Sequence, residues 1–578
     1  MSNLTNNKKN NLLFRFMKIL ETGKVGDRLI LKTLFFLTLT FGILTIIFLL
    51  INNKTDNSLP SGSFSEGIIG SPRFINPVLA FTKTDRDLVK LIYSGLMKID
   101  EKGELVNDLA KNITLSKDGL IYEIELRKDV TFHDNTPITA DDVIYTIKLI
   151  QNTNLKSPLL GNWTDIKVQK INSHKLSLAL PRPYSPFKEN LTLGILPAHS
   201  WNNLQINQIA FSRLNTEPIG SGPYKIKTIS TNPSGLINGY TLEAFNRGYN
   251  QPKIKTIQIK FFNNAESLLE GLLNSNVDAT AYLTPDKIDA VYKTGKFNIK
   301  MSSLPRNFAI FFNQNKSELL RDKNVRKILE NLIDKQKIIK NIFSGYAIPS
   351  QSPIDNNLNM LNYRSDNDTS NSYKIKLLEE NGWTLNDKGV WEKIVDGKPI
   401  TLTLNLKTEK SELFSALAEE IKRQLEKIGI PISIEKADRI TLVESVIRPR
   451  NFSALLYGIE TGYSNDIYPF WHSSQQDDPG LNISQYANVK VDDLLEKTLL
   501  EQDEAKRKKL LTEASDMIML DTPAIFLFKP TMIYVTNKNI KTTNFARLSH
   551  SSDRFYNISN WELDKKENDS LLSSLESK

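Results

Sequence analysis

The chain has 578 residues, of which 40% are hydrophobic and 24% are charged. This balance is typical of globular proteins and excludes a largely disordered, collagen-like or coiled-coil chain. The formal net charge is +9, and eight basic against three acidic residues place +5 of it within residues 1–60. The remaining +4 is spread over the rest of the chain, so the charge pattern does not support a nucleic-acid-binding surface. The absence of cysteine excludes a disulfide, a thiolate metal site and a cysteine nucleophile.

A run of nineteen uncharged residues, Thr33–Ile51, follows the basic N-terminal segment. As a helix it would be about 28 Å long, which is close to the thickness of the hydrocarbon core of a bilayer. Most flanking basic residues precede this run, which predicts a cytoplasmic N-terminus and an external chain after Asn52. We therefore expect a cytoplasmic segment (1–28), a transmembrane signal anchor (29–51) and a tether (52–62). A cleaved signal peptide is the alternative, although the small-residue pattern of a cleavage site is missing.

The rest of the chain mixes strand and helix patterns. Leu120–Arg127 alternates apolar and polar residues, which predicts a half-buried strand, and Lys167–Ile171 with Lys175–Leu180 predicts a hairpin. Capping boxes predict two helix starts, one at Thr84 with Asp87 and one at Thr139 with Asp142.

Two strand–helix–strand units lie far apart in the sequence and predict two α/β lobes, because such units build parallel sheet covered by helices. The predicted units are Ile254–Phe262, Ala265–Leu273 and Val277–Leu283, and then Ile400–Leu406, Leu413–Ile428 and Ile430–Ile434. A helical region over Val491–Leu520 precedes two predicted strands, Ala524–Phe528 and Thr531–Val535.

The sequence lacks the HExxH, GxxxxGK[ST] and GxSxG motifs of common enzymes. The five histidines are scattered without the spacing of metal ligands, so we expect no metal and no cofactor and interpret His133 and His472 as structural. Gly220 and Gly222 lack the third glycine of a dinucleotide site, and we interpret them as a tight crossing of two backbone segments.

Eight motifs in order carry a resemblance to a known family. They are Tyr93–Leu96 with Asp100–Gly103, Asp118–Ile147, Pro218–Ile226, Phe308–Asn313 with Val325–Lys327, Asn381–Trp383 with Gly397–Lys398, Ile428–Ile430, Trp471–Gln475 with Asn482, and Val491–Leu495. Over roughly residues 63 to 535 the chain resembles family 5 of the bacterial extracellular solute-binding proteins, the oligopeptide- and dipeptide-binding components of ABC transporters. Asn135 stands where the family usually has glycine, and Ile328 where it has alanine.

The resemblance implies an α/β, two-lobed periplasmic-binding-protein fold of type II, with an extra subdomain in lobe one. By analogy, lobe one would comprise residues 63–304 and 525–560, with the subdomain near 97–213. Lobe two would comprise 305–524, with hinge crossings near Ser303–Asn307 and Pro523, and 561–578 would form a flexible tail.

The resemblance also implies a function. The protein would capture peptides between its lobes and deliver them to an ABC importer made of permease and ATPase subunits, as a monomer that performs no covalent chemistry. One alternative is the same fold binding another solute, such as a nickel chelate, haem or an oligosaccharide, because Ile459 replaces a family tryptophan. The others are an anchored extracellular hydrolase and a sensor or adhesin without a transporter.

The candidate ligand-binding residues lie in one segment. Gly458 and Gly462 align with family glycines, and Asp466 aligns with an aspartate that family members follow with proline. Asp466 is the candidate partner of a peptide α-ammonium. Two alternatives remain: the amine-binding aspartate of other family members could instead align near Tyr463 or Ser464, and Asp466 could cap a loop. Tyr463 and Trp471 are candidates either for the walls of a ligand pocket or for core packing.

Overall fold

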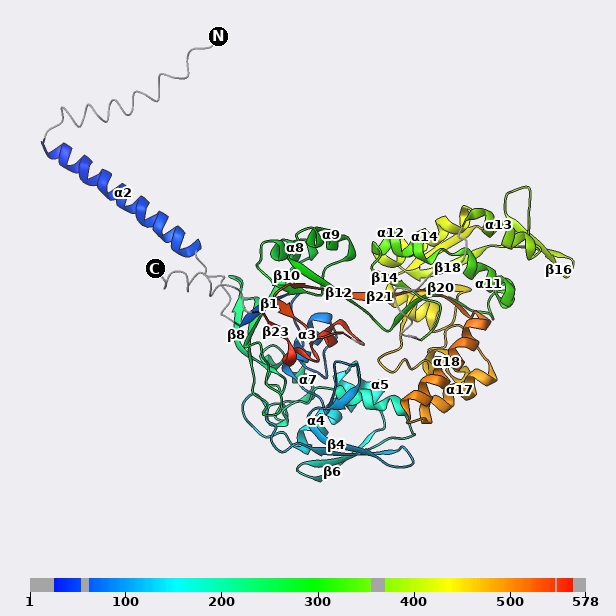
Figure 1. The fold of residues 1–578 in the computed structure, drawn as a ribbon, viewed down its shortest axis with the longest axis horizontal. Coiled ribbons are helices and arrows are strands. Elements are labelled where there is room, and N and C mark those ends of the chain that lie inside the picture. Colours follow the sequence, from blue (N-terminus) through cyan, green and yellow to red (C-terminus); the bar gives the residue numbers. More distant parts are fainter. Residues whose placement is uncertain (1–24, 54–61, 355–369, 546–547, 565–578) are drawn as a thin grey trace, which may run out of the picture. The chain divides into compact units, whose positions relative to one another are not determined.

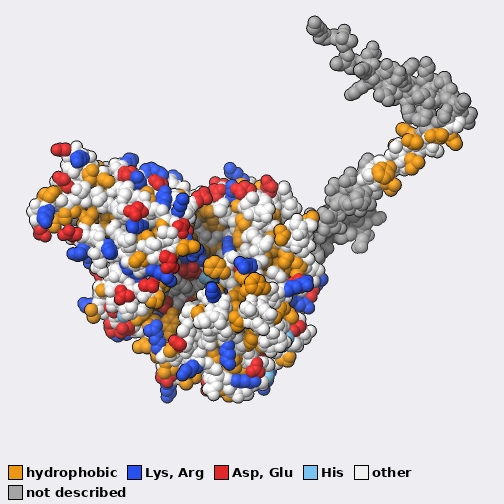
Figure 2. Space-filling model, turned by 180° about the vertical axis from the view of Figure 1, so that it is seen from behind, with side chains coloured by type: hydrophobic (Ala, Val, Ile, Leu, Met, Phe, Trp, Pro, Cys, Tyr) orange, Lys and Arg blue, Asp and Glu red, His pale blue; other side chains and the backbone are white. Residues whose placement is uncertain are grey.

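The computed structural model describes residues 25–53, 62–354, 370–545 and 548–564 (Figure 1). Contacts within the chain define two compact units, Met1–Ser61 and Gly62–Lys578. The described part of the first unit is helix α2 (Val25–Asn53), whose apolar side chains, among them Leu34 and Phe41, are exposed (Figure 2). Within the described residues, no helix combines the length and the apolarity that a membrane span requires. The segment up to residue 24, most of the predicted tether and the tail after residue 564 lie outside the described residues.

A mixed sheet of twelve strands runs through the second unit, in the order β19-β18-β20-β13-β21-β11-β1-β10-β9-β8, with β12 and β14 also paired to β21. Strand β18 is parallel to β19 and β20, and β1 is parallel to β10 and β11, whereas the other pairs are antiparallel. The strands are β1 (Ser63–Ile69), β8 (Tyr224–Thr231), β9 (Ile237–Ala244), β10 (Thr256–Phe262), β11 (Ala279–Thr280), β12 (Phe297–Ser303), β13 (Arg306–Phe312), β14 (Ala347–Pro349), β18 (Leu404–Glu409), β19 (Ile432–Ala437), β20 (Ala454–Glu460) and β21 (Ala524–Asn537).

Buried apolar side chains gather on both halves of this sheet. We call the part whose cores include β1 and β10 lobe one, and the part whose cores include β13, β18 and β20 lobe two. The helices of lobe one are α3 (Lys83–Ile92), α4 (Ala140–Gln151), α5 (Leu160–Trp163), α6 (Ala198–Trp201), α7 (Ile206–Ile209), α8 (Ala265–Leu273) and α9 (Ile288–Tyr292). Those of lobe two are α10 (Glu318–Arg321), α11 (Lys323–Leu332), α12 (Lys335–Phe343), α13 (Asn371–Glu380), α14 (Glu412–Glu426), α15 (Arg439–Thr441), α16 (Tyr468–Trp471), α17 (Val489–Leu500) and α18 (Glu504–Asp521).

Smaller sheets complete both lobes. A four-stranded antiparallel sheet in the order β4-β5-β7-β6 packs beside α4 in lobe one, and β15-β16-β17 forms a separate sheet in lobe two. The strands are β2 (Met97–Ile99), β3 (Leu105–Asn107), β4 (Ala110–Leu115), β5 (Ile121–Leu126), β6 (Lys167–Asn172), β7 (Lys175–Ala179), β15 (Thr384–Leu385), β16 (Trp391–Val395), β17 (Lys398–Thr401), β22 (Ile540–Lys541) and β23 (Glu562–Leu563).

Strand β21 belongs to both lobes. Its first part, residues 524–528, pairs with β13, and its second part, residues 531–537, pairs with β12. The chain therefore passes between the lobes within this one strand, after Phe528, where two separate strands were predicted. It also passes between the lobes at Leu304–Pro305, between β12 and β13.

Most of the predicted elements are confirmed, including the hairpin of β6 and β7 and both parallel units. The capping box at Thr139 and Asp142 is also confirmed. The box predicted at Thr84 and Asp87 was wrong, because the same spacing two residues earlier, Thr82 and Asp85, caps α3. The region predicted as helical over 491–520 forms two helices, α17 and α18, and the strand predicted over 400–406 is divided between β17 and β18.

The interpretation of Gly220 and Gly222 as a tight backbone crossing is confirmed. A Cβ atom on Gly220 would lie 1.9 Å from the carbonyl oxygen of Ile92, and one on Gly222 would lie 2.5 Å from the carbonyl carbon of Ile92. Only glycine leaves room for this approach, which holds the segment before β8 against the end of α3.

Candidate functional site

The segment that follows β20 carries most of the predicted ligand-binding residues and begins with a tight loop. Gly462 and Asn465 have the left-handed backbone conformation, with φ of 68° and 53°. Glycine adopts this conformation without strain, and asparagine is among the few other residues that tolerate it. The loop reverses the chain and places Asp466 just before the short helix α16.

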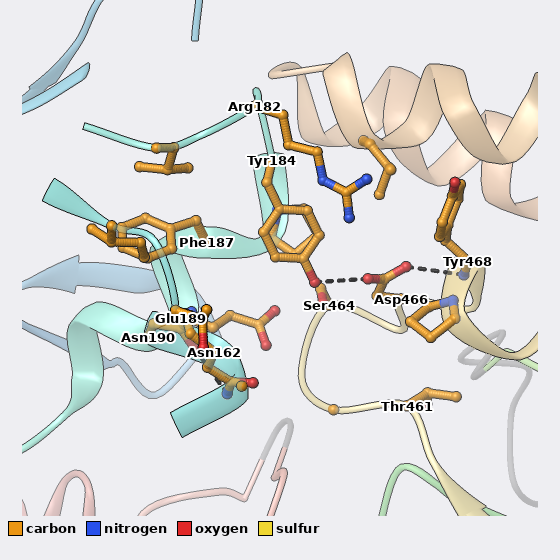
Figure 3. A pocket seen from close by; sticks show the side chains of 18 of the residues that line it. Asn162, Arg182, Tyr184, Phe187, Glu189, Asn190, Thr461, Ser464, Asp466 and Tyr468 are labelled. Atoms are coloured by element: carbon orange, nitrogen blue, oxygen red, sulfur yellow. Dashed lines mark hydrogen bonds between the residues drawn. The ribbon is translucent and has the colours of Figure 1, made fainter. Parts of the chain in front are cut away.

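Asp466 is buried, with 9% of its surface exposed, and each of its carboxylate oxygens accepts a hydrogen bond (Figure 3). The Tyr184 hydroxyl donates to Oδ2 over 2.8 Å, and the backbone N–H of Tyr468 donates to Oδ1 over 3.0 Å. Burial raises the pKa of Asp466, and the two hydrogen bonds, with the positive charges of Arg507 and Arg182, oppose that rise. Among the described residues, no cationic side chain forms an ion pair with Asp466.

A cavity of about 510 Å³ opens beside Asp466 and lies between two parts of the chain that are distant in sequence. Figure 3 shows Tyr184, Phe187 and Asn190 on one side and Ser464 and Asp466 on the other. The first side consists of Gly161, Asn162, Thr164, Ile166, Leu180, Pro181, Arg182, Tyr184, Pro186, Phe187, Glu189 and Asn190. The second consists of Glu460, Thr461, Gly462, Ser464, Asp466, Tyr468, Pro469, Phe470, Gln475 and Leu499. A cavity of this size is within the range of ligand-binding sites.

A second cavity of about 290 Å³ adjoins the first, because Glu189, Asn190 and Gly462 line both. Tyr463 lines this second cavity, together with residues of α3 and of the C-terminal segment of lobe one. The face of the molecule in Figure 2 is hollowed near its centre, and acidic and basic side chains both reach the rim of that hollow.

Glu460 connects the two lobes at the edge of these cavities. Its Oε2 lies 3.0 Å from Nε of Arg306, and its Oε1 lies 3.0 Å from Nδ1 of His550. His550 directly precedes the 3₁₀ helix η7 (Ser551–Phe555), and Phe555 is buried in the core of lobe one. Burial opposes the ionisation of Glu460, but His550 and Arg306 outweigh burial and lower the pKa of this carboxyl.

Of the other predicted site residues, Gly458 and Trp471 lie behind the cavities. Gly458 pairs with Phe308 in the ladder between β13 and β20. Trp471 is fully buried, and its ring packs against those of Phe311 and Phe526. Ile459, which replaces the family tryptophan, is buried in the same apolar cluster as Trp471.

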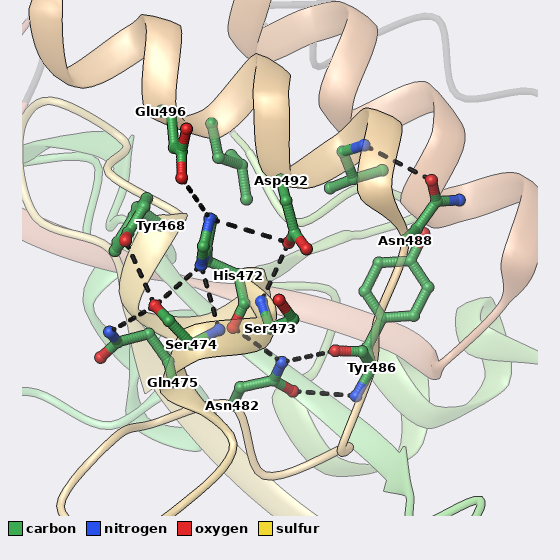
Figure 4. Close-up of polar contacts among 12 residues, drawn as sticks. Tyr468, His472, Ser473, Ser474, Gln475, Asn482, Tyr486, Asn488, Asp492 and Glu496 are labelled. Carbon is green, nitrogen blue, oxygen red and sulfur yellow. Dashed lines mark hydrogen bonds and ion pairs between the residues drawn. The ribbon is translucent and has the colours of Figure 1, made fainter.

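The residues after Trp471 form a polar cluster that holds this segment in place (Figure 4). His472 Nδ1 lies 2.8 Å from Oγ of Ser474, and its Nε2 lies 3.3 Å from Oε1 of Glu496 on α17. The Asn482 amide donates to the backbone carbonyl oxygens of His472 and Tyr486. Within the described part of the chain, no three His, Asp or Glu residues are arranged to hold a metal ion.

His133 also has a structural environment. Its Nδ1 accepts a hydrogen bond from the backbone N–H of Gly220 over 3.2 Å, and its Nε2 lies 3.1 Å from the carbonyl oxygen of Gly222. Burial lowers the pKa of His133 to about 4. The imidazole is therefore neutral at physiological pH and stabilises the glycine crossing.

Sequence reasoning missed the side of the first cavity that Arg182, Tyr184 and Glu189 supply. Tyr184 and Asp466 are 282 positions apart, and no spacing pattern in the sequence connects them. The available signal was the proline-rich segment Pro181–Pro186, which leads into the 3₁₀ helix η2 (Ser185–Thr192) and marks irregular backbone.

Two α/β lobes joined by crossing strands, with cavities between them, define a two-lobed binding protein. The family model of bacterial extracellular solute-binding proteins, family 5, matches residues 104–480, and the chain belongs to this family. Members of the family bind solutes and are not enzymes.

Individual relatives support the assignment. The oligopeptide-binding protein AppA of Bacillus subtilis (strain 168) is 29% identical over 526 residues, which cover 87% of this chain and 92% of that protein. The structure of AppA from Bacillus subtilis in complex with a nonapeptide has a TM-score of 0.63 at 26% identity and covers 87% of this chain and 99% of that one. The structure of NikZ from Campylobacter jejuni in complex with Ni(L-His) also has a TM-score of 0.63 at 26% identity. It covers 87% of this chain and 100% of that one. The expected two-lobed periplasmic-binding-protein fold is thus confirmed.

Proposed function

We propose that the protein is a membrane-anchored external receptor that captures peptides between its lobes and delivers them to an ABC importer. The observation that carries this proposal is Asp466, a buried carboxylate at the side of the first cavity that lacks an ion pair with any described residue. Arg182 and Arg507 act on this carboxylate through their charge without forming an ion pair with it, and a peptide α-ammonium would supply the direct ion-pair partner. A buried pair of this kind stabilises a complex only when it is well hydrogen-bonded, and Tyr184 and Tyr468 already orient the carboxylate.

Peptides as the ligand class are supported by the relative AppA, whose structure holds a nonapeptide. The test is the thermal stability of the full-length protein in detergent, measured with alanine-rich peptides of about two to ten residues. Ligand at 100 times Kd stabilises the folded state by about 2.7 kcal/mol. We expect N-acetylation of the peptide to abolish most of this shift, because it removes the ammonium group.

The matched variants are Asp466→Asn and Asp516→Asn, since Asp516 is exposed on α18 of the same lobe and lies outside both cavities. Asp466→Asn should remove the difference between free and N-acetylated peptides, whereas Asp516→Asn should keep it. If no peptide of the series stabilises the wild-type protein, the peptide proposal fails.

A nickel chelate is the second candidate ligand, because the NikZ structure that holds Ni(L-His) is as similar to this chain as the AppA structure is. The same stability measurement, made with nickel and L-histidine and compared with nickel and EDTA, distinguishes a nickel chelate from a peptide as the ligand. A shift with the nickel–histidine mixture and none with peptides would replace peptides by a metal chelate as the ligand.

The anchor is proposed from the sequence, on the uncharged run Thr33–Ile51 and the basic residues that precede it. We expect the full-length protein to remain in the membrane pellet after a carbonate wash. A chain that begins at Gly62 should be released into the soluble fraction, and release of the full-length protein as well would contradict the anchor.

A further inference from the structure

Glu460 and His550 form a contact that exists only while the two lobes are close together. Glu460 is the last residue of β20 in lobe two, and His550 directly precedes η7 in lobe one. Oε1 of Glu460 lies 3.0 Å from Nδ1 of His550. A side-chain hydrogen bond is lost beyond about 3.5 Å, so a displacement of one lobe against the other by about 1–2 Å breaks this contact.

Glu460 is held in place within lobe two, whatever the position of lobe one. It pairs directly with Arg306 in the ladder between β13 and β20, and its Oε2 lies 3.0 Å from Nε of Arg306. Both strands belong to lobe two, so this pair persists when the lobes move apart. Despite burial, His550 and Arg306 lower the pKa of Glu460, so the carboxyl is ionised at neutral pH. Its other oxygen, Oε1, is left for a partner on lobe one.

His550 is likewise held in place within lobe one. Its backbone N–H donates to Oδ2 of Asp553 over 2.8 Å. Arg554 of η7 is fully buried and forms an ion pair with Asp87 of α3, and Figure 1 shows this C-terminal segment, in red, beside α3. Closure therefore brings together two side chains that each lobe has already positioned, which limits the conformational entropy lost when the contact forms.

The contact lies next to the crossing between the lobes at Leu304–Pro305. Arg306 directly follows this crossing, and the backbone N–H of Thr461 donates to the carbonyl oxygen of Pro305 over 3.0 Å. Glu460 is therefore joined to the crossing through both of its neighbours, one along the chain and one across the ladder. A contact that is present at one hinge angle and absent at others favours that angle by its own free energy.

We propose that Glu460 and His550 form a latch that stabilises the closed arrangement of the lobes, whatever ligand lies between them. In the open arrangement Glu460 keeps Arg306 and loses His550, so the latch contributes to the closed state alone. Both side chains of the latch are more than one-third exposed, and ion pairs of this kind change an equilibrium by no more than about fivefold. The latch positions the lobes and is independent of the class of ligand, so it does not rest on the peptide proposal.

The first test is single-molecule energy transfer between dyes on the two lobes of the full-length, ligand-free protein in detergent. The natural chain has no cysteine, so Lys148→Cys on α4 and Glu513→Cys on α18 provide two unique, exposed attachment points, one in each lobe. We expect His550→Ala and Glu460→Ala each to lower the ratio of closed to open molecules about threefold.

A double-mutant cycle isolates the latch, because Glu460→Ala also removes the pair with Arg306 inside lobe two. Residues in direct contact have non-additive effects, so the double variant should have about the same ratio as either single variant. The matched control is Glu444→Ala, whose carboxylate is exposed and pairs with Arg448 within lobe two. It should leave the ratio of closed to open molecules unchanged.

The second test is the dissociation rate of bound peptides, measured by stopped flow with two peptides of different length that stabilise the protein. Because the latch favours the closed lobes and not a particular ligand, His550→Ala should raise the dissociation rate about threefold for both peptides. Glu444→Ala should leave both rates unchanged.

Three results overturn the inference. An unchanged ratio of closed to open molecules in both single variants would exclude a latch, and additive effects in the double variant would show that the two residues act separately. Glu460 and His550 also line the cavities, so slower or faster peptide dissociation without a change in the ligand-free ratio would assign them to ligand contacts instead. If no peptide binds the wild type, the proposed function fails, and the energy-transfer measurement still decides the latch.

Discussion

The hydroxyl group of Tyr184 lies 2.8 Å from Oδ2 of Asp466, although these two residues are 282 positions apart in the chain. The contact joins the loop before η2 to the loop after β20 and closes one side of the first cavity. Tyr184 donates a hydrogen bond but carries no positive charge, so it orients the carboxylate without neutralising it. Arg182 and Arg507 act on Asp466 through their charge but form no ion pair with it, so the carboxylate keeps its direct ion-pair position for a cationic group of a ligand.

Tyr184→Phe removes this hydrogen bond and tests its effect on the ionisation of Asp466. Burial raises the pKa of Asp466, and the Tyr184 hydrogen bond opposes the rise, so its loss should raise the pKa further. Peptide binding that needs the ionised carboxylate is lost as the pH falls through this pKa. The acid midpoint of binding, measured by calorimetry, should therefore move to higher pH in the variant. Tyr292→Phe, at an exposed tyrosine, should leave the midpoint unchanged.

Asp466→Asn should increase the stability of the ligand-free protein at neutral pH while it weakens binding. The pKa of Asp466 is higher in the folded than in the unfolded protein, so an ionised Asp466 lowers the free energy of unfolding. This loss of stability grows as the pH rises from the ordinary pKa of aspartate to the raised one. The amide removes the charge but can still accept from the Tyr468 N–H. We expect a gain of about 1 kcal/mol in urea unfolding at pH 7 that disappears in acid. A loss of stability at pH 7 would show that the carboxylate is instead stabilising.

Much of the fold follows from local sequence patterns. Short-range patterns predict β5 from its alternation of apolar residues and α14 from its amphipathic face. The strands on either side of α14 are predicted in the same way, and tertiary contacts stabilise all of these elements. The start of α3 was misplaced because Thr-x-x-Asp occurs twice within six residues, and local sequence does not choose between them. The tertiary structure selects Thr82 and Asp85 as the capping box, because Asp87 is buried in an ion pair with Arg554.

Only one side of the candidate site, the segment after β20, could be predicted from the sequence. Gly462 and Asp466 could be found because they lie in one short segment with a recognisable motif after them. Tyr184 reaches the same cavity from lobe one, and only the packing of the two lobes brings it beside Asp466. No periodicity encodes that approach, so it could not be predicted from a single sequence.

Gly220→Ala tests the tight crossing between α3 and the segment before β8. The new Cβ would lie 1.9 Å from the Ile92 carbonyl oxygen, so backbone must move, and overpacking of this kind destabilises by about 1–3 kcal/mol or more. The matched control is Gly161→Ala, where a Cβ would have no neighbour within 4 Å. Urea unfolding should show a large loss for Gly220→Ala and a change within about 0.5 kcal/mol for the control. Similar stabilities for the two variants would contradict the tight crossing.

Arg554 is fully buried and links the C-terminal segment to the centre of lobe one. Its Nη2 lies 2.8 Å from Oε1 of Glu66 and 2.7 Å from Oδ2 of Asp87, and both carboxylates are fully buried as well. The Tyr534 hydroxyl donates to the other oxygen of Glu66 over 2.8 Å. Burial raises the pKa of Glu66 even with the arginine beside it.

Arg554→Met should destabilise the protein by about 3–5 kcal/mol at pH 7, because it leaves buried carboxylates without their cation. Without the arginine, the folded-state pKa of Glu66 rises further above its ordinary value. The loss of stability caused by ionised Glu66 is therefore complete above that raised pKa. This loss should shrink as the pH falls through the raised pKa and Glu66 becomes protonated. The control Arg213→Met removes an arginine whose side chain is 82% exposed and should change stability by less than about 1 kcal/mol. Urea unfolding at two pH values measures both variants, and a loss for Arg554→Met that is small or independent of pH would show that the carboxylates do not depend on this arginine.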